Sequence, residues 1–242
     1  MKTFEELKEE LLNRAKNANA CQNGYKMGLD AKNKADLLKA ITANWLWVLI
    51  DARIVDAIYL EENFTEEELS EAGIYTRKFH EVRTVSFVCG SATVKACGSA
   101  TVEACGSATV KAYDSATVKA CGSATVKACD SATVKACGSA TVEAYDSATV
   151  EACGSATVKA CDSATVKAYG SATVEAYDSA TVEACGSATV KAYDSATVEA
   201  YGESYVEDCT GNIRPGSDYA IIKDYHNHKI YIRKGKFEII EV

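Results

Sequence analysis

The sequence predicts a flattened, two-sided β-solenoid that carries an N-terminal α-helical domain and a C-terminal β-meander cap. An eight-residue unit, SATV(K/E)A(C/Y)(G/D), repeats fourteen times without a gap over residues 91–202. Its last position alternates strictly between Gly and Asp from Gly106 onward, so the structural period is sixteen residues. A fixed period is typical of stacked repeat architectures. We expect the helical domain at residues 1–82, the solenoid at 83–210 and the cap at 211–242.

The segment before the repeats has the pattern of three or four helices. Thr3 with Glu6, and Thr65 with Glu68, have the spacing of capping boxes, which start helices. Apolar residues recur at helical spacing over residues 35–60. The segment is therefore predicted to form a small helical bundle.

Two tryptophans lie in that apolar pattern. Trp45 and Trp47 are two positions apart, so they cannot share one face of a helix. We expect one in the helical core and the other against the first coil or a partner. An enzyme would have to use this domain, but Cys21 has no histidine or acidic partner at a recognisable spacing, and His80 stands alone.

The octad itself predicts which side chains face inward. Position five is Lys in eight octads and Glu in six, and an unpaired charge is costly to bury, so it must face water. Side chains alternate along a strand, so Thr at position three and Cys or Tyr at position seven also point outward. Ala, Val and Ala at positions two, four and six then form the core.

The corners of each coil are predicted at positions eight and one. Glycine tolerates a positive φ, and an Asp side chain is expected to bond the backbone N–H two residues on. Two octads would make one coil, and coils would stack at about 4.8 Å. A three-sided coil is excluded because it would mix Gly and Asp in every column. In the two charge columns, eight of twelve neighbouring pairs are opposite in sign, which relieves repulsion.

The cysteines follow the repeat. Ten of the eleven lie at position seven of octads or of their degenerate flanks. Reduced thiols that share a half-exposed position with Tyr are the favoured interpretation. Disulfide rungs between coils stay open, because neighbouring coils bring Cα atoms within bonding range. Metal binding is disfavoured, because a straight thiol ladder is not tetrahedral and the chain contains no CxxC pair. One column would hold Cys89, Cys105, Cys121, Cys137 and Cys153, and the other Cys97, Cys129, Cys161 and Cys209.

The net charge and the apolar content limit the kinds of partner that the protein is expected to bind. A net charge of −8 argues against nonspecific binding to nucleic acid or an anionic membrane. No basic-then-apolar signal segment opens the sequence, and the apolar stretch at residues 45–50 is too short to span a bilayer. We expect a cytoplasmic protein, or one released by a route that needs no N-terminal signal.

The C-terminal segment has the pattern of strands. Residues 203–210 are a decayed octad, and strands are expected at residues 219–225, 229–233 and 236–242. Turns are expected at His226-Asn227-His228 and at Lys234-Gly235. The His-Asn-His triplet is interpreted as a polar hairpin tip, with a metal site as the alternative. Caps at both ends are expected, because open strand edges invite fibre growth.

The repeats carry two resemblances. In general form the chain resembles tandem-repeat β-solenoid proteins of bacterial and phage genomes. The corners Tyr-Gly-Ser at residues 169–171 and Tyr-Asp-Ser at 177–179 are similar to the repeats of bacterial ice-nucleation proteins. That resemblance implies stacked sixteen-residue coils, Thr-x-Thr rows that organise water and association through a tyrosine ladder. Here Thr-Val-Lys or Thr-Val-Glu stands where the Thr-x-Thr row would be.

The uniform repeat predicts a non-enzymatic structural or interaction protein without a cofactor. It would act as a rigid spacer or a self-associating scaffold, because a catalytic site needs one coil to differ from the rest. We expect a protein partner or self-association, for instance a homodimer, and neither nucleic acid nor membrane.

Alternatives are recognition of a repetitive target (polymer, crystal face or ice), cation binding by the Asp column (Asp114, Asp130, Asp146, Asp162, Asp178, Asp194) and DNA mimicry. No catalytic, cofactor or metal residues are expected. The candidate interaction ladder is Tyr113, Tyr145, Tyr169, Tyr177, Tyr193, Tyr201, Cys105, Cys121, Cys137 and Cys153.

Overall fold

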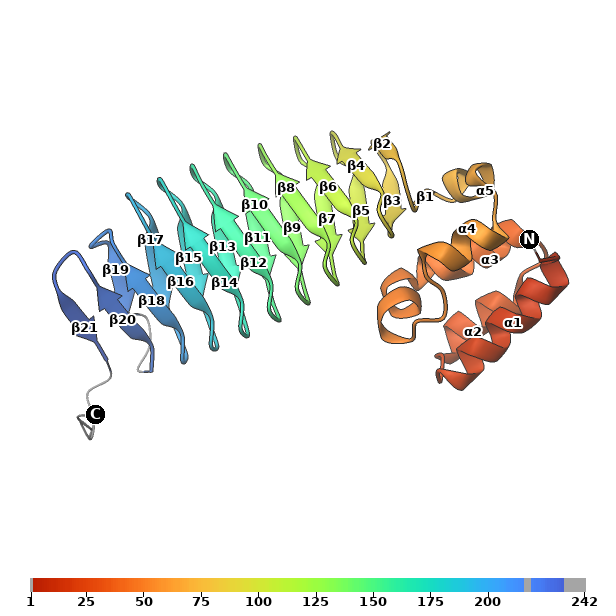
Figure 1. Ribbon diagram of the computed structural model, residues 1–242, viewed down its shortest axis with the longest axis horizontal. Helices are drawn as coiled ribbons and strands as arrows, with labels where there is room; N and C mark the ends of the chain where they lie inside the picture. Colours follow the sequence, from red (N-terminus) through yellow and green to blue (C-terminus); the bar gives the residue numbers. More distant parts are fainter. Residues whose placement is uncertain (1, 216–218, 233–242) are drawn as a thin grey trace. The chain divides into compact units, whose positions relative to one another are not determined.

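The computed structural model describes residues 2–215 and 219–232, and in them the chain forms a β-solenoid of about nine turns (Figure 1). Parallel strands recur about sixteen residues apart, and a helical segment precedes them, as the sequence predicts. Residues 1–127 and 128–242 form two units, which are described in turn.

The helical segment opens the first unit. Both predicted capping boxes are present: Thr3 and Glu6 bond each other's backbone N–H at the start of the first helix, and Thr65 and Glu68 do so at the start of the last. Between residues 2 and 73 the elements are α1 (Phe4–Asn17), α2 (Gln22–Asp30), α3 (Lys34–Ala43), the π-helical turn η1 (Trp47–Asp51), α4 (Ala57–Asn63) and α5 (Glu66–Glu71).

The long apolar pattern at residues 35–60 is not one helix. Helix α3 stops at its C-cap Asn44, η1 follows, and α4 begins where the Asp56 side chain accepts the Tyr59 N–H at 2.7 Å. Asp56 is a second N-cap inside the apolar pattern, and apolar spacing alone does not reveal it. The described part of the segment therefore has more helices than the three or four expected.

The first strands arise before the repeats. They are β1 (Ile74–Tyr75), β2 (Phe79–Val82) and β3 (Val85–Val88). Strand β1 pairs in parallel with β3, and β2 pairs in parallel with β4 (Thr93–Ala96). Residues 74–82 thus form part of a first coil, whereas the sequence indicates a start at residue 83. The residues of β2, FHEV, depart from the octad consensus, so the repeat pattern does not predict this strand.

Trp45 has both of the roles that the sequence divides between two tryptophans. Its side chain is 1% exposed in the helical core, and its ring centroid lies 5.4 Å from that of Phe87 in β3. Trp47 is half-buried at the edge of the same core. One tryptophan can have both roles because the helical core also contains residues of the first coils, namely Ile74, Cys89 and Cys105.

The coils of the first unit stack in register. The remaining strands are β5 (Thr101–Ala104), β6 (Thr109–Ala112), β7 (Thr117–Ala120) and β8 (Thr125–Ala128), which reaches the boundary of the unit. One sheet has the order β1-β3-β5-β7 and the other β2-β4-β6-β8. Thr101 lies opposite Thr117, so like residues face like residues between coils.

The second unit has the same parallel, in-register pairing of strands. Strand β11 pairs with β9 and β13, with Thr149 opposite Thr133 and Thr165. The strands are β9 (Thr133–Ala136), β10 (Thr141–Ala144), β11 (Thr149–Ala152), β12 (Thr157–Ala160), β13 (Thr165–Ala168), β14 (Thr173–Ala176), β15 (Thr181–Ala184), β16 (Thr189–Ala192), β17 (Thr197–Ala200) and β18 (Tyr205–Asp208).

The inward and outward sides follow the predicted parity. The Ala, Val and Ala of positions two, four and six are fully buried in every octad, as with Ala148, Val150 and Ala152. Thr149 and Glu151 on the same strand are exposed. Each coil therefore contributes small, closely packed side chains to a dry core.

Beyond the repeats the coils extend further than the sequence indicates. Strand β19 (Ile213–Pro215) pairs in parallel with β17, and β20 (Ile221–Asp224) pairs in parallel with β18. Strand β21 (Lys229–Tyr231) then pairs antiparallel with β20. The hairpin turn at residues 226–228 is confirmed. The turn predicted at residues 234–235 and the strand at 236–242 lie outside the described residues.

Two buried aspartates mark this end. Asp208 and Asp224 take the inward position that Ala holds in the repeats, and they lie opposite each other in register. Asp208 accepts the N–H of Thr210 at 2.6 Å, and Asp224 accepts the N–H of Asn227 at 2.8 Å. Both carboxylates thus satisfy turn N–H groups. The hydrogen bonds from Asn227 hold the pKa of Asp224 below its usual range.

Candidate functional site

The two corners of a coil differ chemically although both have a positive φ. Gly154 has φ +69° and Asp162 has φ +58°. A Cβ added at Gly154 would lie 3.2 Å from the backbone N and O of Gly138 in the preceding coil. The Gly corner therefore leaves little room for a side chain, whereas the other corner holds one. This difference explains why Gly and Asp alternate.

The Asp side chains do not make the predicted local turn bond. The N–H two residues beyond Asp146, that of Ala148, donates instead to the Tyr145 carbonyl at 3.1 Å. The Asp146 carboxylate reaches the neighbouring coil and accepts the Asp130 N–H at 3.1 Å. The same bond joins Asp114 to Gly98, Asp162 to Asp146, Asp178 to Asp162, and Asp194 to Asp178, at 2.8–3.3 Å. The Asp column is a ladder of bonds between coils.

Each of these five carboxylates thus has a structural role. Among the described residues, no three His, Cys, Asp or Glu side chains come together in a way that could hold a metal ion. The cation-binding alternative therefore depends on carboxylate oxygens that the ladder leaves unused.

The charge columns form ion pairs between coils. Within the first unit Lys119 lies 3.0 Å from Glu103, and within the second Lys167 lies 2.9 Å from Glu183. The lysine side chains are 50% and 53% exposed, so solvent screens these pairs and each contributes little to stability. Further pairs are Lys135 with Glu151 and Lys191 with Glu207. Three of these four pairs lie on one sheet and Lys191 with Glu207 lies on the other, so their main effect is to neutralise neighbouring charges on both faces.

Position-seven residues divide between two columns by the sixteen-residue period. We call them the Gly-corner column and the Asp-corner column, after the residue that follows; in the Asp-corner column the exceptions are the first and last members, which precede Gly98 and Thr210. The Gly-corner column contains Cys89, Cys105, Cys121, Cys137, Cys153, Tyr169, Cys185 and Tyr201. The Asp-corner column contains Cys97, Tyr113, Cys129, Tyr145, Cys161, Tyr177, Tyr193 and Cys209. The ten predicted ladder residues therefore belong to two surfaces, not one.

The tyrosines meet at one place in the repeats. Tyr177 and Tyr193 are in consecutive coils, and their rings stack with centroids 4.9 Å apart and an interplanar angle of 11°. The Lys159 ammonium lies 5.2 Å from the Tyr177 ring centroid. Both rings are half-buried, so each keeps part of its surface in solvent. This pair is the largest aromatic surface that the repeats present.

Several tyrosine hydroxyls are held by the charge at position five. Tyr177 donates to Glu175 at 3.1 Å, and Tyr201 donates to Glu199 at 3.0 Å. Tyr145 donates to Glu143 in the same way. Partial desolvation and the Glu175 hydrogen bond raise the pKa of Tyr177. These hydroxyls are oriented along their own strand.

The Gly-corner column has a covered end and an open part. Cys89 and Cys105 are 2% and 1% exposed because the helical core packs over them. The hydrogen bond with Cys105, followed by burial, strongly raises the pKa of Cys89. Cys105, predicted as part of an exposed ladder, is therefore inaccessible. Cys137 and Cys153 are half-buried, with their Sγ atoms 3.0 Å apart.

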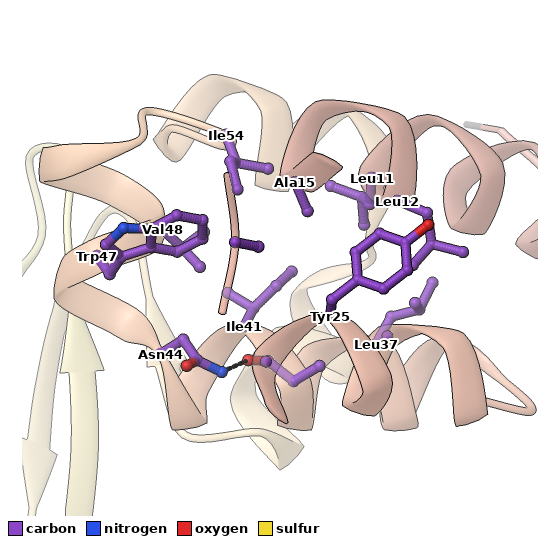
Figure 2. Close-up of a pocket in the computed structure, with 14 residues that line it drawn as sticks. Leu11, Leu12, Ala15, Tyr25, Leu37, Ile41, Asn44, Trp47, Val48 and Ile54 are labelled. Atoms are coloured by element: carbon purple, nitrogen blue, oxygen red, sulfur yellow. Dashed lines mark hydrogen bonds between the residues drawn. The ribbon is translucent and has the colours of Figure 1, made fainter. Parts of the chain in front are cut away.

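A pocket in the helical segment has no counterpart in the sequence analysis. Figure 2 shows Leu37, Ile41 and Val48 around it, with Trp47 at one end and Tyr25 nearby. It encloses about 60 Å³, which is small for a ligand. A polar side chain at its rim, that of Asn44, already donates to the Ala40 carbonyl at 2.9 Å. The same apolar periodicity predicts a packed core, so no sequence signal distinguishes the pocket.

Comparison with known proteins adds no relative. The chain matches no protein-family model, no curated protein and no solved structure. The resemblance to ice-nucleation repeats therefore depends on the sixteen-residue double octad and its corner residues. Over the described residues, no helix has the length and apolar character needed to cross a bilayer.

Proposed function

We propose that this chain is a non-enzymatic repeat scaffold that associates laterally with a second copy through the Asp-corner column. The observation that carries the proposal is the equivalence of the coils. Burial and strand register repeat from octad to octad, so no interior coil offers a distinct catalytic arrangement. A surface that repeats is suited to repeated contacts.

The stacked rings of Tyr177 and Tyr193 supply the contact. Aromatic side chains dominate the energy of interfaces, and the charges beside them are already paired or oriented within the chain. Across a two-fold interface the same column would meet itself, which a flat row of rings and thiols allows. Lys159 and Glu175, which flank the rings, are opposite in sign, so self-contact does not bring together like charges alone.

The test is the absolute molar mass, measured by light scattering on a sizing column with and without reductant. We expect a discrete dimer or larger species that survives reductant in the natural sequence. The double variant Tyr177→Ser/Tyr193→Ser should shift it to monomer, whereas Thr173→Ser/Thr189→Ser, on the two strands that precede these tyrosines, should not. A monomer in both conditions would contradict self-association and leave the spacer role.

Recognition of a repetitive target is a second candidate, favoured by the Thr columns. Thr141, Thr157 and Thr173 lie opposite one another on successive strands, and strand neighbours are about 4.8 Å apart. A polymer or crystal face with that repeat would meet one hydroxyl per coil. Affinity should then rise steeply with the number of coils. Binding that does not depend on coil number would exclude this candidate.

A further inference from the structure

We propose that Cys137 and Cys153 are a thiol pair that a low-molecular-weight disulfide, such as oxidised glutathione, converts to a disulfide joining two neighbouring coils. The proposal is independent of self-association, because it concerns a bond within one chain. It rests on the register of two strands, the distance between two sulfur atoms and the exposure of the pair.

The register brings the cysteines face to face. Strands β9 and β11 pair in parallel with Ala136 opposite Ala152, so the next residues, Cys137 and Cys153, are also opposite. The Cys153 N–H donates to the Ala136 carbonyl at 2.9 Å, which holds the backbones together at this point. Strand neighbours at about 4.8 Å are inside the Cα range that a disulfide needs.

The sulfur atoms already face each other. Their separation is 3.0 Å, so a shift of about 1 Å would bring them to bonding distance. Position seven follows the last residue of each strand, at the start of the corner, where a small shift does not disturb the buried Ala and Val columns. The ion pair of Lys135 and Glu151, two residues earlier, spans the same two coils.

Neighbouring cysteines are confined to one part of the chain. In the Asp-corner column, Tyr residues separate Cys97, Cys129 and Cys161, so no two of these three are in consecutive coils. Tyr169 likewise separates Cys153 from Cys185. Consecutive cysteines occur in the Gly-corner column from Cys89 to Cys153, and the helical core covers Cys89 and Cys105. Cys137 and Cys153 belong to the open part of that run.

The exchange has two steps. One thiolate attacks a sulfur of oxidised glutathione, breaks its S–S bond and releases one glutathione thiolate, leaving a mixed disulfide on the protein. The neighbouring thiolate then attacks the protein sulfur and releases the second glutathione. The two protein thiols are oxidised, one glutathione disulfide is reduced to two thiols, and the two thiol protons end on glutathione.

The rate of the exchange depends on the fraction of the thiol that is ionised to thiolate. Burial and the hydrogen bond with Cys137 raise the pKa of Cys153 to about 11. Lys135 favours its ionisation and Glu151 opposes it. Exchange is therefore slow near neutral pH, and the reaction is best run at about pH 8.5.

Cys89 and Cys105 provide a matched pair within the same molecule. Val88 lies opposite Ala104, so these cysteines have the same register as Cys137 and Cys153. They differ in burial, because the helical core excludes solvent and oxidant from them. The two pairs share the strand register, but Cys89 is buried and its pKa is strongly raised, so both its inaccessibility and its low ionisation oppose reaction with the oxidant.

The experiment uses the full reduced chain, treated with oxidised glutathione, quenched with acid, unfolded and alkylated. Trypsin then releases residues 136–159 as one peptide, which contains Cys137 and Cys153 and no other cysteine. We expect this peptide to be lighter by two hydrogens and free of alkylation. Peptides 84–95, with Cys89, and 96–111, with Cys97 and Cys105, should stay alkylated and separate. The oxidised protein should melt at a higher temperature, since the bond restrains the unfolded chain.

Two variants separate the alternatives. Cys121→Ser removes the preceding cysteine of the Gly-corner column and should leave the closed peptide unchanged. If Cys121 were the partner of Cys137 instead, the unsubstituted chain would yield residues 136–159 joined to residues 120–127, and no closed peptide. Cys153→Ser should leave Cys137 carrying glutathione, because no second thiolate resolves it. The proposal fails if residues 136–159 keep two alkyl groups while Cys21, an exposed cysteine in the helical segment, takes up glutathione. Equal closure of the Cys89 and Cys105 pair would also overturn it.

Discussion

At the scale of single residues, the corner of the coil shows two solutions to one backbone requirement. A positive φ strains most residues, and Gly and Asp tolerate it for different reasons. Gly154 lacks the atom that would collide with the preceding coil. Asp162 accepts an N–H from the preceding coil through its carboxylate. Neither residue can replace the other without a cost.

Replacing Asp162 tests the ladder. Asp162→Ala should destabilise the fold by about 1–2 kcal/mol, because it removes the bond to the Asp146 N–H and leaves a Cβ residue at positive φ without compensation. Asp162→Asn keeps an acceptor oxygen and should cost much less. The measurement is the urea midpoint of each variant. Equal losses for Ala and Asn would show that the hydrogen bond contributes little.

Replacing Gly154 tests the crowded corner. Gly154→Ala should cost about 1–2 kcal/mol, from the strain of φ +69° and from a Cβ placed 3.2 Å from the Gly138 backbone. Gly98 is a matched control, with φ +65° and no atom within 4 Å of its added Cβ. Gly98→Ala should therefore bear the φ strain alone and lose less stability. If both variants lose the same amount in thermal unfolding, crowding is not the reason for the Gly column.

The buried thiol of Cys89 makes stability depend on alkaline pH. Its pKa is raised in the folded state above the ordinary value of 9.0, so the folded chain holds the proton more tightly than the unfolded chain. The contribution is fully present below about pH 9 and is lost as pH rises further. Urea midpoints measured between about pH 8 and pH 10 should fall, and should fall less in Cys89→Ala. Parallel curves for the two proteins would remove Cys89 as the cause.

At the scale of the strand, the orientation of each side chain can be predicted from the octad, because each position of the octad has the same environment in every repeat. Eight Lys and six Glu at one position allow only an outward orientation, and the parity of a strand then fixes every other side chain. The structure confirms that argument for Ala, Val and Thr. The Asp bond was not predictable, because the same carboxylate can accept either a local N–H or an N–H of the neighbouring coil.

The flanking strands were harder to predict for a related reason. In β2, His80 lies opposite Val94 and occupies an inward position, with its ring tilted against that of Tyr75 and the ring centroids 4.4 Å apart. A histidine there breaks the apolar alternation on which a prediction depends. Likewise the cover over Cys89 and Cys105 is a tertiary contact with the helical segment, and no local pattern contains it.

The core of one strand offers a direct measure of packing. Val150 is fully buried between like residues, Val134 and Val166, of neighbouring coils. Val150→Ala should cost about 1–3 kcal/mol, since a column of Ala and Val has little freedom to close a cavity. Thr149→Ala, on the outward side of the same strand, should change the unfolding free energy by much less. Comparable losses at both positions would contradict the inward and outward assignment.

At the scale of the whole molecule, the repeating unit is the coil of sixteen residues and not the octad. Deleting residues 147–162 removes one coil and returns each Gly and Asp to its own column. We expect the shortened chain to fold with nearly unchanged thermal stability. Deleting residues 147–154 alone exchanges the two corners in all later coils, so Asp would fall in the crowded Gly column. That variant should unfold at a clearly lower temperature, as followed by circular dichroism, and equal melting would contradict a two-octad unit.

The unlike corners also constrain how such a gene can change. Tandem DNA repeats gain and lose copies by slippage and unequal exchange. Because the octads are nearly identical, such an event can add or remove any whole number of octads, each of eight codons. A step of eight codons places Asp where the backbone leaves little room for a Cβ, and a step of sixteen does not. Selection for folding should therefore retain length variants that differ by even numbers of octads. The alternation of Gly and Asp at the corners would therefore restrict changes in the length of the protein to whole coils of two octads.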